Sequence, residues 1–583
     1  MKKSLLDIMN VMRSSENIES TWQEIDIISV PKGNKNPHKM SNKRSISLTD
    51  TVCKVFERLV LNRIAHKIPF TEAQAGARKG RSTTDQVFIL KSAIRSRTAR
   101  KQPTYIAFLD LHKAYDKVWR SAILENLWIA GIRGKSWRIM KSLNENIKVK
   151  IATRYGHTRE VNMTEGIRQG GVLSGAEFAF LIDRLECHLQ EAGHGILHGQ
   201  DLITTLLLMD DIILMADSPA QLQSMLNETN RFANTWHLAF SPEKSKVMGF
   251  NDKNLGPHQW RLGKLMLQQT WEYRYLGEQI SQSQTLTPHI KLLEQKMYTH
   301  TNRILAIAND DVLSRIKMNS LFQLNDKCLI PALTYNCETW TPSNKEDVKI
   351  DNLQIKALRT LLKSPISKPK VGFYLELGIY PLSATIHCRQ LMYLWKLLNT
   401  KSRATKTLNT EKQEQNNNSW YTYVTNLLER YNLPTVNNII TFKRNKWKEL
   451  LTSTIKQYYN QEIMIEATTS SKLATLAAYK NTPSLENYML VLSRKRASAI
   501  FSLRCKSTKA LHMNKHQDPI PICHLCDSAL ASDNHLYSLC PATADARAKY
   551  NINDLDELYK TSPDIDILKR YADLAIELGI TIE

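Results

Sequence analysis

Hydrophobic and polar positions follow different patterns in the two halves of the chain. The run IDIISVPKG at 25–33 predicts a strand closed by a Pro-Lys-Gly turn. After Asp50, a plausible helix N-cap, apolar residues recur at helical spacing up to residue 64, which predicts a helix. The run TYIAFLDL at 104–111 has the apolar character of a buried strand. Beyond about residue 285 the helical period dominates, so we expect an α/β first half and a mostly helical second half.

An acidic pair interrupts the apolar segment LITTLLLMDDIILMA at 202–216. Asp210 and Asp211 are expected at a tight hairpin turn between two buried strands. Burying carboxylates without compensation is costly, and a bound divalent cation removes that cost. Hard oxygen ligands suit Mg²⁺. The alternative, a solvent-exposed Asp-Asp turn, stays open at this point.

A third carboxylate, Asp110, ends the apolar run YIAFL. Nucleotidyl transfer uses two metal ions that clamp the attacking and leaving oxygens, and carboxylates on neighbouring strands can hold such a pair. Asp110 and Asp210 on two strand ends are therefore the minimum set that this chemistry needs. Asp116 is interpreted as a helix-surface or capping residue.

The segment 400–419, TKSRATKTLNTEKQEQNNNS, is polar and nearly free of large apolar residues. Such composition is typical of a linker or a long surface loop, which we expect here. The length of 583 residues suggests about three or four domains. The sequence has no apolar run of about 18 residues and no cleavable leader pattern, so we expect an intracellular protein without a membrane partner.

The charge balance favours polyanionic partners. Lys and Arg number 79 and Asp and Glu 56, a net charge of +23, and each phosphate that a protein neutralises releases condensed counterions. The nine cysteines do not suggest a disulfide framework but a reducing compartment. Six of them are scattered and are expected to pack as small apolar residues: Cys53, Cys187, Cys328, Cys337, Cys388 and Cys505.

The other three cysteines form a metal-ligand pattern with one histidine. Cys523, Cys526, His535 and Cys540 are spaced C-x2-C-x8-H-x4-C. Zn²⁺ takes four such ligands tetrahedrally, and no position is left open for a substrate, so we predict a structural zinc site. Zinc knuckles also bind single-stranded nucleic acid, and a purely architectural role is the alternative.

A series of ordered strings resembles one known family. FLDLHKAYDKVW, GIRQGGVLS, LLLMDDIIL, SPEKSKVMGF and YRYLGE resemble the successive palm motifs of non-LTR (LINE-type) retrotransposon reverse transcriptases. RSISLTDTVCKVFERLVLNRI and QAGARKGRSTTDQ resemble the preceding finger motifs, and ELGIYPL with the Cys/His box resembles the region after the thumb. The resemblance covers about residue 22 to about residue 545. Leu208 and Met209 depart from it, since an aromatic residue and alanine are usual there.

The resemblance implies an α/β (α+β) right-hand polymerase with fingers, palm and helical thumb, then a mostly helical connector and a small zinc knuckle. The implied boundaries are fingers at 1–103, palm with finger insertions at 104–282, thumb at 283–350, connector at 351–505 with a polar linker near 400–419, and zinc knuckle with C-terminal tail at 506–583.

The resemblance also implies residue roles. Asp110 and Asp210 would be the principal Mg²⁺ ligands, with Asp211 assisting. Tyr115 would select deoxynucleotides against the ribose 2′-hydroxyl, and Lys244 would protonate or electrostatically stabilise the leaving pyrophosphate. Gln169, in a Gly-rich turn, would approach the nascent base pair. The implied phosphate contacts are Lys32, Arg44, Arg78 and Arg81. Core packing of Tyr115 and exposed basic surfaces elsewhere remain the alternatives.

The function implied is an RNA-directed DNA polymerase that extends a DNA primer on an RNA template from deoxynucleoside triphosphates, with two Mg²⁺ ions (or Mn²⁺) and a structural Zn²⁺. No endonuclease is found in the sequence, so we expect a 5′-truncated element copy, and work on a chromosomal primer implies the nucleus. One alternative is a catalytically idle, domesticated RNA-binding remnant. Another is a maturase-like or telomerase-like polymerase. The oligomeric state stays open.

Overall fold

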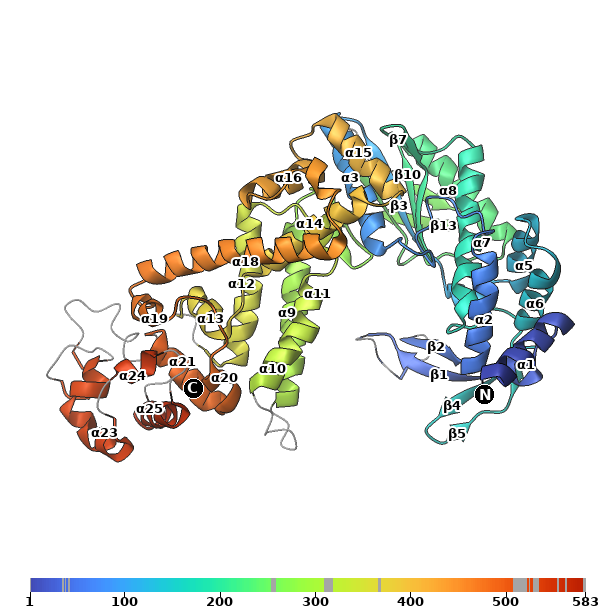
Figure 1. Cartoon of the computed structure of the whole chain (residues 1–583). Helices are drawn as coiled ribbons and strands as arrows, with labels where there is room; N and C mark the ends of the chain where they lie inside the picture. The colour runs from blue at the N-terminus through green and yellow to red at the C-terminus, as the bar shows by residue number, and fades with distance from the viewer. Residues whose placement is uncertain are drawn as a thin grey trace. The chain divides into compact units, whose positions relative to one another are not determined.

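The structure is a computed structural model that divides into two units. It describes residues 2–33, 36, 38–39, 42–252, 258–308, 318–364, 368–506, 522–523, 525–527, 534–552, 555–560 and 564–579. The first unit comprises Met1–Leu276, Ile280–Gln284 and Thr400–Tyr421, and the second comprises Gly277–Gln279, Thr285–Asn399 and Thr422–Glu583. The chain therefore returns to the first unit after the second has begun (Figure 1).

The first unit mixes helices with strands. Its strands are β1 (Glu24–Pro31), β2 (Lys43–Leu48), β3 (Thr104–Asp110), β4 (Lys148–Thr153), β5 (Gly156–His157), β6 (Val161–Asn162), β7 (Ile196–His198), β8 (Asp201–Ile203), β9 (Thr205–Leu208), β10 (Asp211–Ala216), β11 (Lys246–Phe250), β12 (Trp260–Leu262), β13 (Leu265–Gln269), β14 (Glu272–Tyr275) and β15 (Glu278–Ser281), the last leading into the second unit. Its helices are α1 (Lys2–Ser15), α2 (Thr51–Ile64), α3 (Thr83–Ala99), α4 (Ala114–Lys117), α5 (Arg120–Ile129), α6 (Gly134–Asn144), α7 (Val172–Glu191), α8 (Pro219–Thr235) and α15 (Arg403–Glu414), with a 3₁₀ turn at Ser20–Gln23.

A six-stranded sheet with the order β12-β13-β11-β3-β10-β9 forms the centre of the first unit. The predicted strands at 104–111 and on both sides of Asp210 are confirmed as β3, β9 and β10. β3 is buried from Thr104 to Leu109, because its two neighbours and the helices leave neither face exposed. Its antiparallel partners β10 and β11 make β3 and β10 adjacent interior strands.

A smaller sheet has the order β2-β1-β4-β5, with β6 also paired to β4. β1 confirms the strand predicted at 25–33. The helix predicted after Asp50 is confirmed as α2, and the Asp50 carboxylate accepts hydrogen bonds from the backbone N–H groups of Val52 and Cys53. Val55 and Leu59, two of the apolar residues that recur at helical spacing in this segment, are 44% and 42% exposed. The buried face instead includes Glu57, whose carboxylate accepts from the backbone N–H of Leu173 in the first turn of α7.

Helix α3 is buried almost all round, because the sheet lies on one side of it and α15 packs on another. Contrary to the linker or loop expected at 400–419, residues Arg403–Glu414 form a helix that belongs to the first unit. Figure 1 shows α15 lying beside α3. The side chain of Trp420 is fully buried, with its ring centroid 5.1 Å from that of Phe88 on α3.

The second unit is mainly helical in its described residues. Its elements are α9 (Thr287–Ala308), α10 (Met318–Leu324), a π-helical turn (Asn325–Leu329), α11 (Ile330–Leu333), a 3₁₀ turn (Cys337–Thr339), α12 (Asn344–Leu361), α13 (Lys370–Leu377), α14 (Leu382–Leu398), α16 (Trp420–Arg430, entered from the first unit), α17 (Val436–Ile439), α18 (Arg444–Thr469), α19 (Ala474–Tyr479), α20 (Asn487–Val491), α21 (Arg494–Arg504), a π-helical turn (His535–Leu539), a 3₁₀ turn (Pro541–Thr543), α23 (Ala544–Tyr550), α24 (Asp556–Tyr559) and α25 (Ile565–Glu577).

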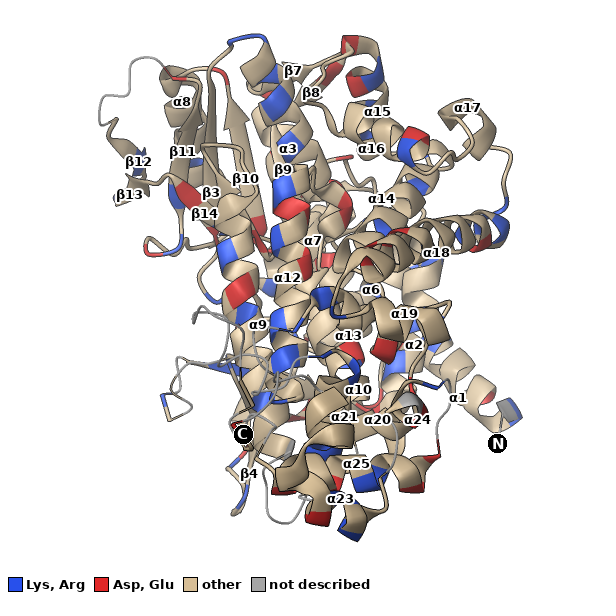
Figure 2. Ribbon diagram, turned by 90° about the vertical axis from the view of Figure 1, so that its left-hand side faces the viewer, with Lys and Arg blue, Asp and Glu red and all other residues tan. Residues whose placement is uncertain are grey.

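The core of this unit includes the Cys/His segment. Cys523 and Cys540 are buried in one apolar cluster with residues of α12, α13 and α18–α21. The described part of the zinc knuckle expected at 506–583 therefore shares an apolar core with helices of the expected connector. On α18 the Lys and Arg residues lie in the first half of the helix, and two of its three Glu residues lie in the second half (Figure 2). Among the described residues, none of the helices is both long and apolar enough to cross a membrane.

Candidate active site and metal centre

Three aspartates meet at one end of the central sheet. In the β3–β10 register Asp110 lies directly opposite Asp211, and in the β9–β10 register Asp211 lies opposite Leu208. Met209 and Asp210 therefore form a two-residue turn, and Met209 adopts a positive φ of 59°. This is the tight hairpin expected from the sequence, and it brings the acidic pair beside Asp110.

The three carboxyl groups lie in a partly buried, mutually repelling environment. Burial first, and then the charges of Asp210 and Asp110, raise the pKa of Asp211 to about 7. Burial also raises the pKa of Asp210, whereas the positive charges of Lys244 and Arg44 lower it by a smaller amount. The Nζ of Lys244 lies 2.7 Å from Oδ2 of Asp110. The three aspartates, which we call the aspartate corner, thus gather negative charge where little water reaches it. The ammonium group of Lys244 lies against one of them.

Lys244 is placed by the loop that leads into β11. The backbone N–H of Asp110 donates to Oγ of Ser245 at 3.2 Å, and the Tyr273 hydroxyl donates to the carbonyl oxygen of Lys244 at 3.1 Å. The ring of Tyr273 stacks on that of Phe108 with centroids 4.2 Å apart. The predicted lysine is therefore attached to the same sheet edge as the aspartates.

Tyr115 and Gln169 come from two segments that contact each other. The backbone N–H of Ile167 donates to the carbonyl oxygen of Tyr115 at 2.8 Å. The Tyr115 ring packs on Phe178 with centroids 5.0 Å apart, and burial, with a smaller effect of Asp210, raises its pKa to about 12. The carbonyl oxygen of Gln169 accepts from the backbone N–H of Ser47 at 2.9 Å. Core packing of Tyr115 is thus observed, and a nucleotide contact remains a prediction.

Glycines are required where this loop meets β2. A Cβ on Gly170 would lie 2.4 Å from the carbonyl oxygen of Ser47, and the φ of Gly170 is 149°. The adjoining helix α7 is anchored by Glu57, whose carboxylate accepts from Leu173 and pairs with Arg168 at 2.7 Å. Both members of this ion pair are almost completely buried, so the Gly-rich turn is fixed from two sides.

The four predicted phosphate contacts are in different situations. Arg44 is an exposed residue of β2, and Lys32 follows β1 with its backbone N–H bonded to Asn42. Arg78 and Arg81 instead pair with Glu72, at 3.4 and 2.7 Å. The structure does not bring Arg78 or Arg81 to the aspartates by any contact, because their guanidinium groups are held by protein acceptors.

Gln74 was missed by reasoning from the sequence. Its side chain is fully buried, and its Oε1 accepts from the backbone N–H groups of Gly76 and Met209, at 2.8 and 3.3 Å. Its Nε2 donates to the carbonyl oxygen of Ala179 on α7 at 3.1 Å. Gln74 therefore ties the aspartate turn to α7. The string QAGARKG contained it, but only the arginines there carried a charge that suggested a role.

The predicted zinc ligands are brought together in the second unit. One ligand atom from each of Cys523, Cys526, His535 and Cys540 lies within 4.8 Å of all the others. The sulfurs of Cys523 and Cys540 are 3.8 Å apart. A tetrahedral zinc with bonds of about 2.3 Å separates two sulfur ligands by about 3.8 Å. The residues present therefore fit a zinc ion, and three of the four are buried.

The aspartate corner fits a harder cation. Its donors are carboxylate oxygens, which Mg²⁺ prefers, and burial disfavours their ionised forms unless a positive charge is near. Among the described residues, the four zinc ligands are the one set of three or more donors within 4.8 Å of each other. The carboxylate oxygens of Asp110, Asp210 and Asp211 do not all lie within 4.8 Å of one another. Ligands that are divided between two ions can be spaced in this way.

Comparison with known proteins agrees with this geometry. The sequence profile of the family described as reverse transcriptase (RNA-dependent DNA polymerase) matches residues 30–280. The chain is 24% identical over 395 residues to a probable RNA-directed DNA polymerase from transposon BS of Drosophila melanogaster, covering 65% of this chain and 42% of that protein. It is 26% identical over 355 residues to the RNA-directed DNA polymerase from mobile element jockey of Drosophila funebris, covering 58% and 37%.

A third relative is the Pol polyprotein from type-1 retrotransposable element R2 of Popillia japonica, 27% identical over 233 residues, with coverage of 39% of this chain and 32% of that protein. This chain thus spans about two fifths or less of the length of these relatives. A solved structure of telomerase from Candida albicans, in complex with a fragment of telomeric RNA, aligns with 12% identity and a TM-score of 0.36, covering 76% of this chain and 67% of that one. Residues 30–280 are a reverse transcriptase domain, and the chain is a relative of the RNA-directed DNA polymerases of non-LTR retrotransposons.

Proposed function

We propose that this protein extends a DNA primer on an RNA template, with Asp110, Asp210 and Asp211 as the ligands of two Mg²⁺ ions. The observation that carries the proposal is the register that sets Asp110 opposite Asp211 beside a two-residue turn holding Asp210. When bound, the ions would supply Lewis acidity to the attacking primer 3′-hydroxyl and to the departing pyrophosphate. The aspartates would hold them by carboxylate oxygens alone.

Lys244 would change partners during this reaction. In the structure its ammonium group is paired with Asp110 at 2.7 Å, and its side chain is 58% exposed. Once Asp110 serves as a metal ligand, Lys244 would be released toward the triphosphate, where it could donate a proton to the leaving pyrophosphate or stabilise it by charge. The exposed flexible stem makes this exchange possible without a change in the sheet.

Tyr115 and Gln169 would define the nucleotide and base-pair side of the site. The Tyr115 ring is fixed by Phe178 and its backbone by Ile167, so a sugar 2′-hydroxyl would meet a rigid wall. Arg44 and Lys32 would contact triphosphate oxygens. For Arg78 and Arg81 we propose a structural role through Glu72, in place of the phosphate contact expected from the sequence.

The domain assignment follows the same proposal. Residues 1–103 would be the fingers, 104–282 the palm, 283–350 the thumb and 351–505 the connector. The zinc-bearing C-terminal part would stabilise the helical unit through its shared core. Work on a chromosomal primer strand would place the protein in the nucleus.

Primer extension tests the proposal. The purified protein is given an RNA template, an annealed DNA primer, deoxynucleoside triphosphates and Mg²⁺, beside Asp210→Asn and the matched control Asp217→Asn. Asp217 is exposed and lies just beyond the end of β10. Extension by the wild type and the control, but not by Asp210→Asn, is expected. Retained RNA binding without extension by any of the three would instead favour an idle RNA-binding remnant.

A further inference from the structure

A segment far along the chain packs against the strand that carries the aspartate turn. Residues Thr400–Tyr421 leave the second unit and join the first. Ser402 caps α15 by accepting from the backbone N–H of Thr405 at 3.1 Å, which fixes where the helix starts. Farther along the helix, Oγ1 of Thr410 lies so close to Gly199 that a Cβ there would be 2.4 Å away. The segment thus packs closely against the turn between β7 and β8.

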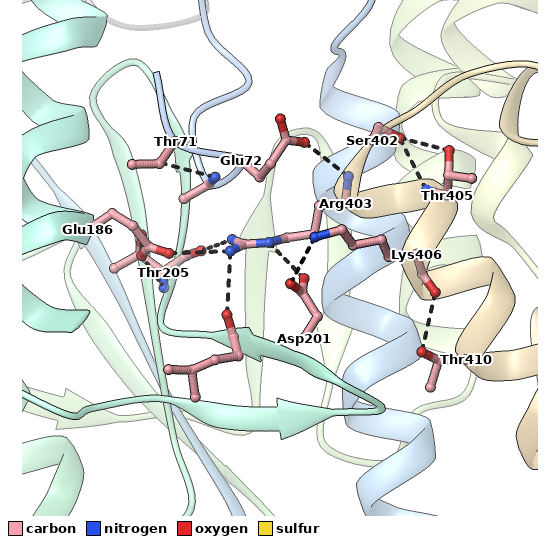
Figure 3. A network of polar contacts seen from close by, with 12 residues as sticks. Thr71, Glu72, Glu186, Asp201, Thr205, Ser402, Arg403, Thr405, Lys406 and Thr410 are labelled. Atoms are coloured by element: carbon pink, nitrogen blue, oxygen red, sulfur yellow. Dashed lines mark hydrogen bonds and ion pairs between the residues drawn. The ribbon is translucent and has the colours of Figure 1, made fainter. Parts of the chain in front are cut away.

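Arg403, the first residue of α15, is the polar anchor of this segment. Its side chain is 6% exposed, and it pairs with Asp201 at 3.0 Å and with the fully buried Glu186 at 3.4 Å. It also donates to the carbonyl oxygens of Thr205 and Leu202, both at 3.4 Å. Figure 3 shows the guanidinium group between Glu186, Thr205 and Asp201.

One acceptor of Arg403, the carbonyl oxygen of Thr205, belongs to the aspartate hairpin, and a second, Glu186 on α7, bonds to the same threonine. Glu186 accepts from the backbone N–H and the hydroxyl of Thr205, at 2.9 and 2.6 Å. Thr205 is the first residue of β9, and the turn with Asp210 follows directly after that strand. Arg403 and Glu186 therefore fix the start of the strand whose end presents the aspartate.

A second path runs through the backbone of Arg403. Its N–H donates to Oε2 of Glu72 at 3.1 Å. Two residues later, Gln74 accepts from the N–H of Met209 in the turn. Between them, Ala73 accepts from the N–H of Leu207 at 3.0 Å. Both ends of β9 are thus connected to the same residue of α15.

We propose that Arg403 is a positioning residue for the turn that carries Asp210. The polymerase domain is then completed by residues 400–421, a segment beyond the matched family region that we call the strap. The proposal rests on the proposed function of Asp210. Replacing a buried ion pair by apolar residues often costs little stability, so we assign this pair to fixing the position of the strand. The family match ends at residue 280, whereas the strap lies at 400–421.

The test compares Arg403→Met with Lys406→Met in the whole 583-residue chain. Lys406 is one turn further along α15, is 62% exposed and lies 3.5 Å from Asp201, so it shares the charge of Arg403 and one of its partners but is not buried. Arg403→Lys is the conservative variant, which keeps the charge without the fork that serves several acceptors. Two readouts are taken: amide hydrogen exchange at residues 201–216, and the Mg²⁺ concentration that gives half-maximal primer extension.

Arg403→Met is expected to speed exchange selectively at 201–216 and to raise the Mg²⁺ midpoint about tenfold, the scale of losing an outer-shell partner of a metal ligand. Primer-template affinity should stay unchanged, Arg403→Lys should be intermediate, and Lys406→Met should resemble the wild type. Unchanged exchange at 201–216 would overturn the proposal. The proposal would also be overturned by a uniform rise in amide hydrogen exchange across the first unit, with fewer active molecules but the same Mg²⁺ midpoint. If the wild type extends no primer, the proposed function fails, while hydrogen exchange still decides whether Arg403 holds the turn.

Discussion

At the scale of single residues, the Asp211 carboxyl group makes the stability of the metal-free protein depend on pH. Its pKa is raised from 3.8 to about 7 by burial and by its two acidic neighbours. Between about pH 4 and pH 7 the unfolded chain therefore loses this proton while the folded chain keeps it. By linkage, the group's contribution to stability falls as pH rises through that window.

Asp211→Asn should accordingly raise the melting temperature of the metal-free protein more at pH 8 than at pH 5. The gain is expected to be a few degrees, as about 1 kcal/mol shifts a domain of this size by about 2–4 °C. Thermal melts in buffer without added Mg²⁺ and without a chelator, which would also remove zinc, measure it. The exposed Asp116, changed to Asn, is the control. An equal gain at both pH values would contradict the assigned burial effect.

Gln74 gives a second prediction at this scale. Gln74→Leu keeps the volume but leaves the N–H groups of Gly76 and Met209 without their acceptor. Each unpaired buried donor costs about 1–3 kcal/mol, and the aspartate turn loses its tie to α7. We expect a lower melting temperature and slower primer extension at saturating substrate. Gln102→Leu, at an exposed glutamine, should change neither, and wild-type behaviour of Gln74→Leu would refute this role.

The three aspartates and Gln74 differ in how readily their roles can be recognised from the sequence. Asp110, Asp210 and Asp211 stand out because charged residues interrupt apolar runs, and their adjacency follows from strand pairing. Gln74 works through backbone groups of Met209 and Ala179, which are distant in sequence. No local pattern indicates such partners, so a buried amide of this kind appears only once the fold is known.

At the scale of elements, the Cys/His cluster should stabilise the helices that share its core. Removing zinc would leave the Cys523 and Cys540 thiols and His535 facing each other in an apolar environment without their shared ligand. Cys523→Ser or a strong chelator is expected to lower the melting temperature and loosen α21 and α25, as metal-binding energy becomes folding energy. Metal analysis should find one zinc per chain. Cys328→Ser, at an exposed cysteine outside the cluster, should leave both zinc content and melting temperature unchanged.

Elements that depend on residues nearby in the sequence were predictable, whereas one element that depends on contacts with distant residues was not. The Asp50 cap and the apolar runs at β3, β9 and β10 were recognised from neighbouring residues alone. The helix at α15 was missed because its buried face includes Arg403, Thr407 and Glu411, which look like solvent-facing residues. Their burial depends on partners supplied by Glu186, Asp201 and α3, so composition indicated a loop where tertiary contacts select a helix.

At the scale of the whole molecule, the matched family region and the folded unit have different boundaries. The match covers residues 30–280, while the first unit also takes in Thr400–Tyr421. A chain that stops at residue 284 would uncover the outer face of α3, including Phe88 where Trp420 now packs. Exposed apolar faces of this kind promote association.

We therefore expect a protein of residues 1–284 to aggregate, and the same protein with residues 400–421 joined through a flexible Gly/Ser linker to be soluble and monodisperse. Size-exclusion chromatography distinguishes them. The fusion protein that carries Trp420→Ala should aggregate more than the fusion protein with the wild-type segment. Equal solubility of the shortest chain would show that α15 is dispensable for folding of this unit.

Magnesium-dependent primer extension by Asp110→Asn and Asp116→Asn tests the central claim most directly. The two residues are six positions apart, but Asp110 pairs with Asp211 in the sheet while Asp116 is exposed. We predict that Asp110→Asn loses at least about 10²–10³-fold in rate, the scale of removing a group that stabilises transition-state charge, and that Asp116→Asn stays close to the wild type. Equal activity of the two variants would contradict the assignment of the aspartate corner as the catalytic metal site.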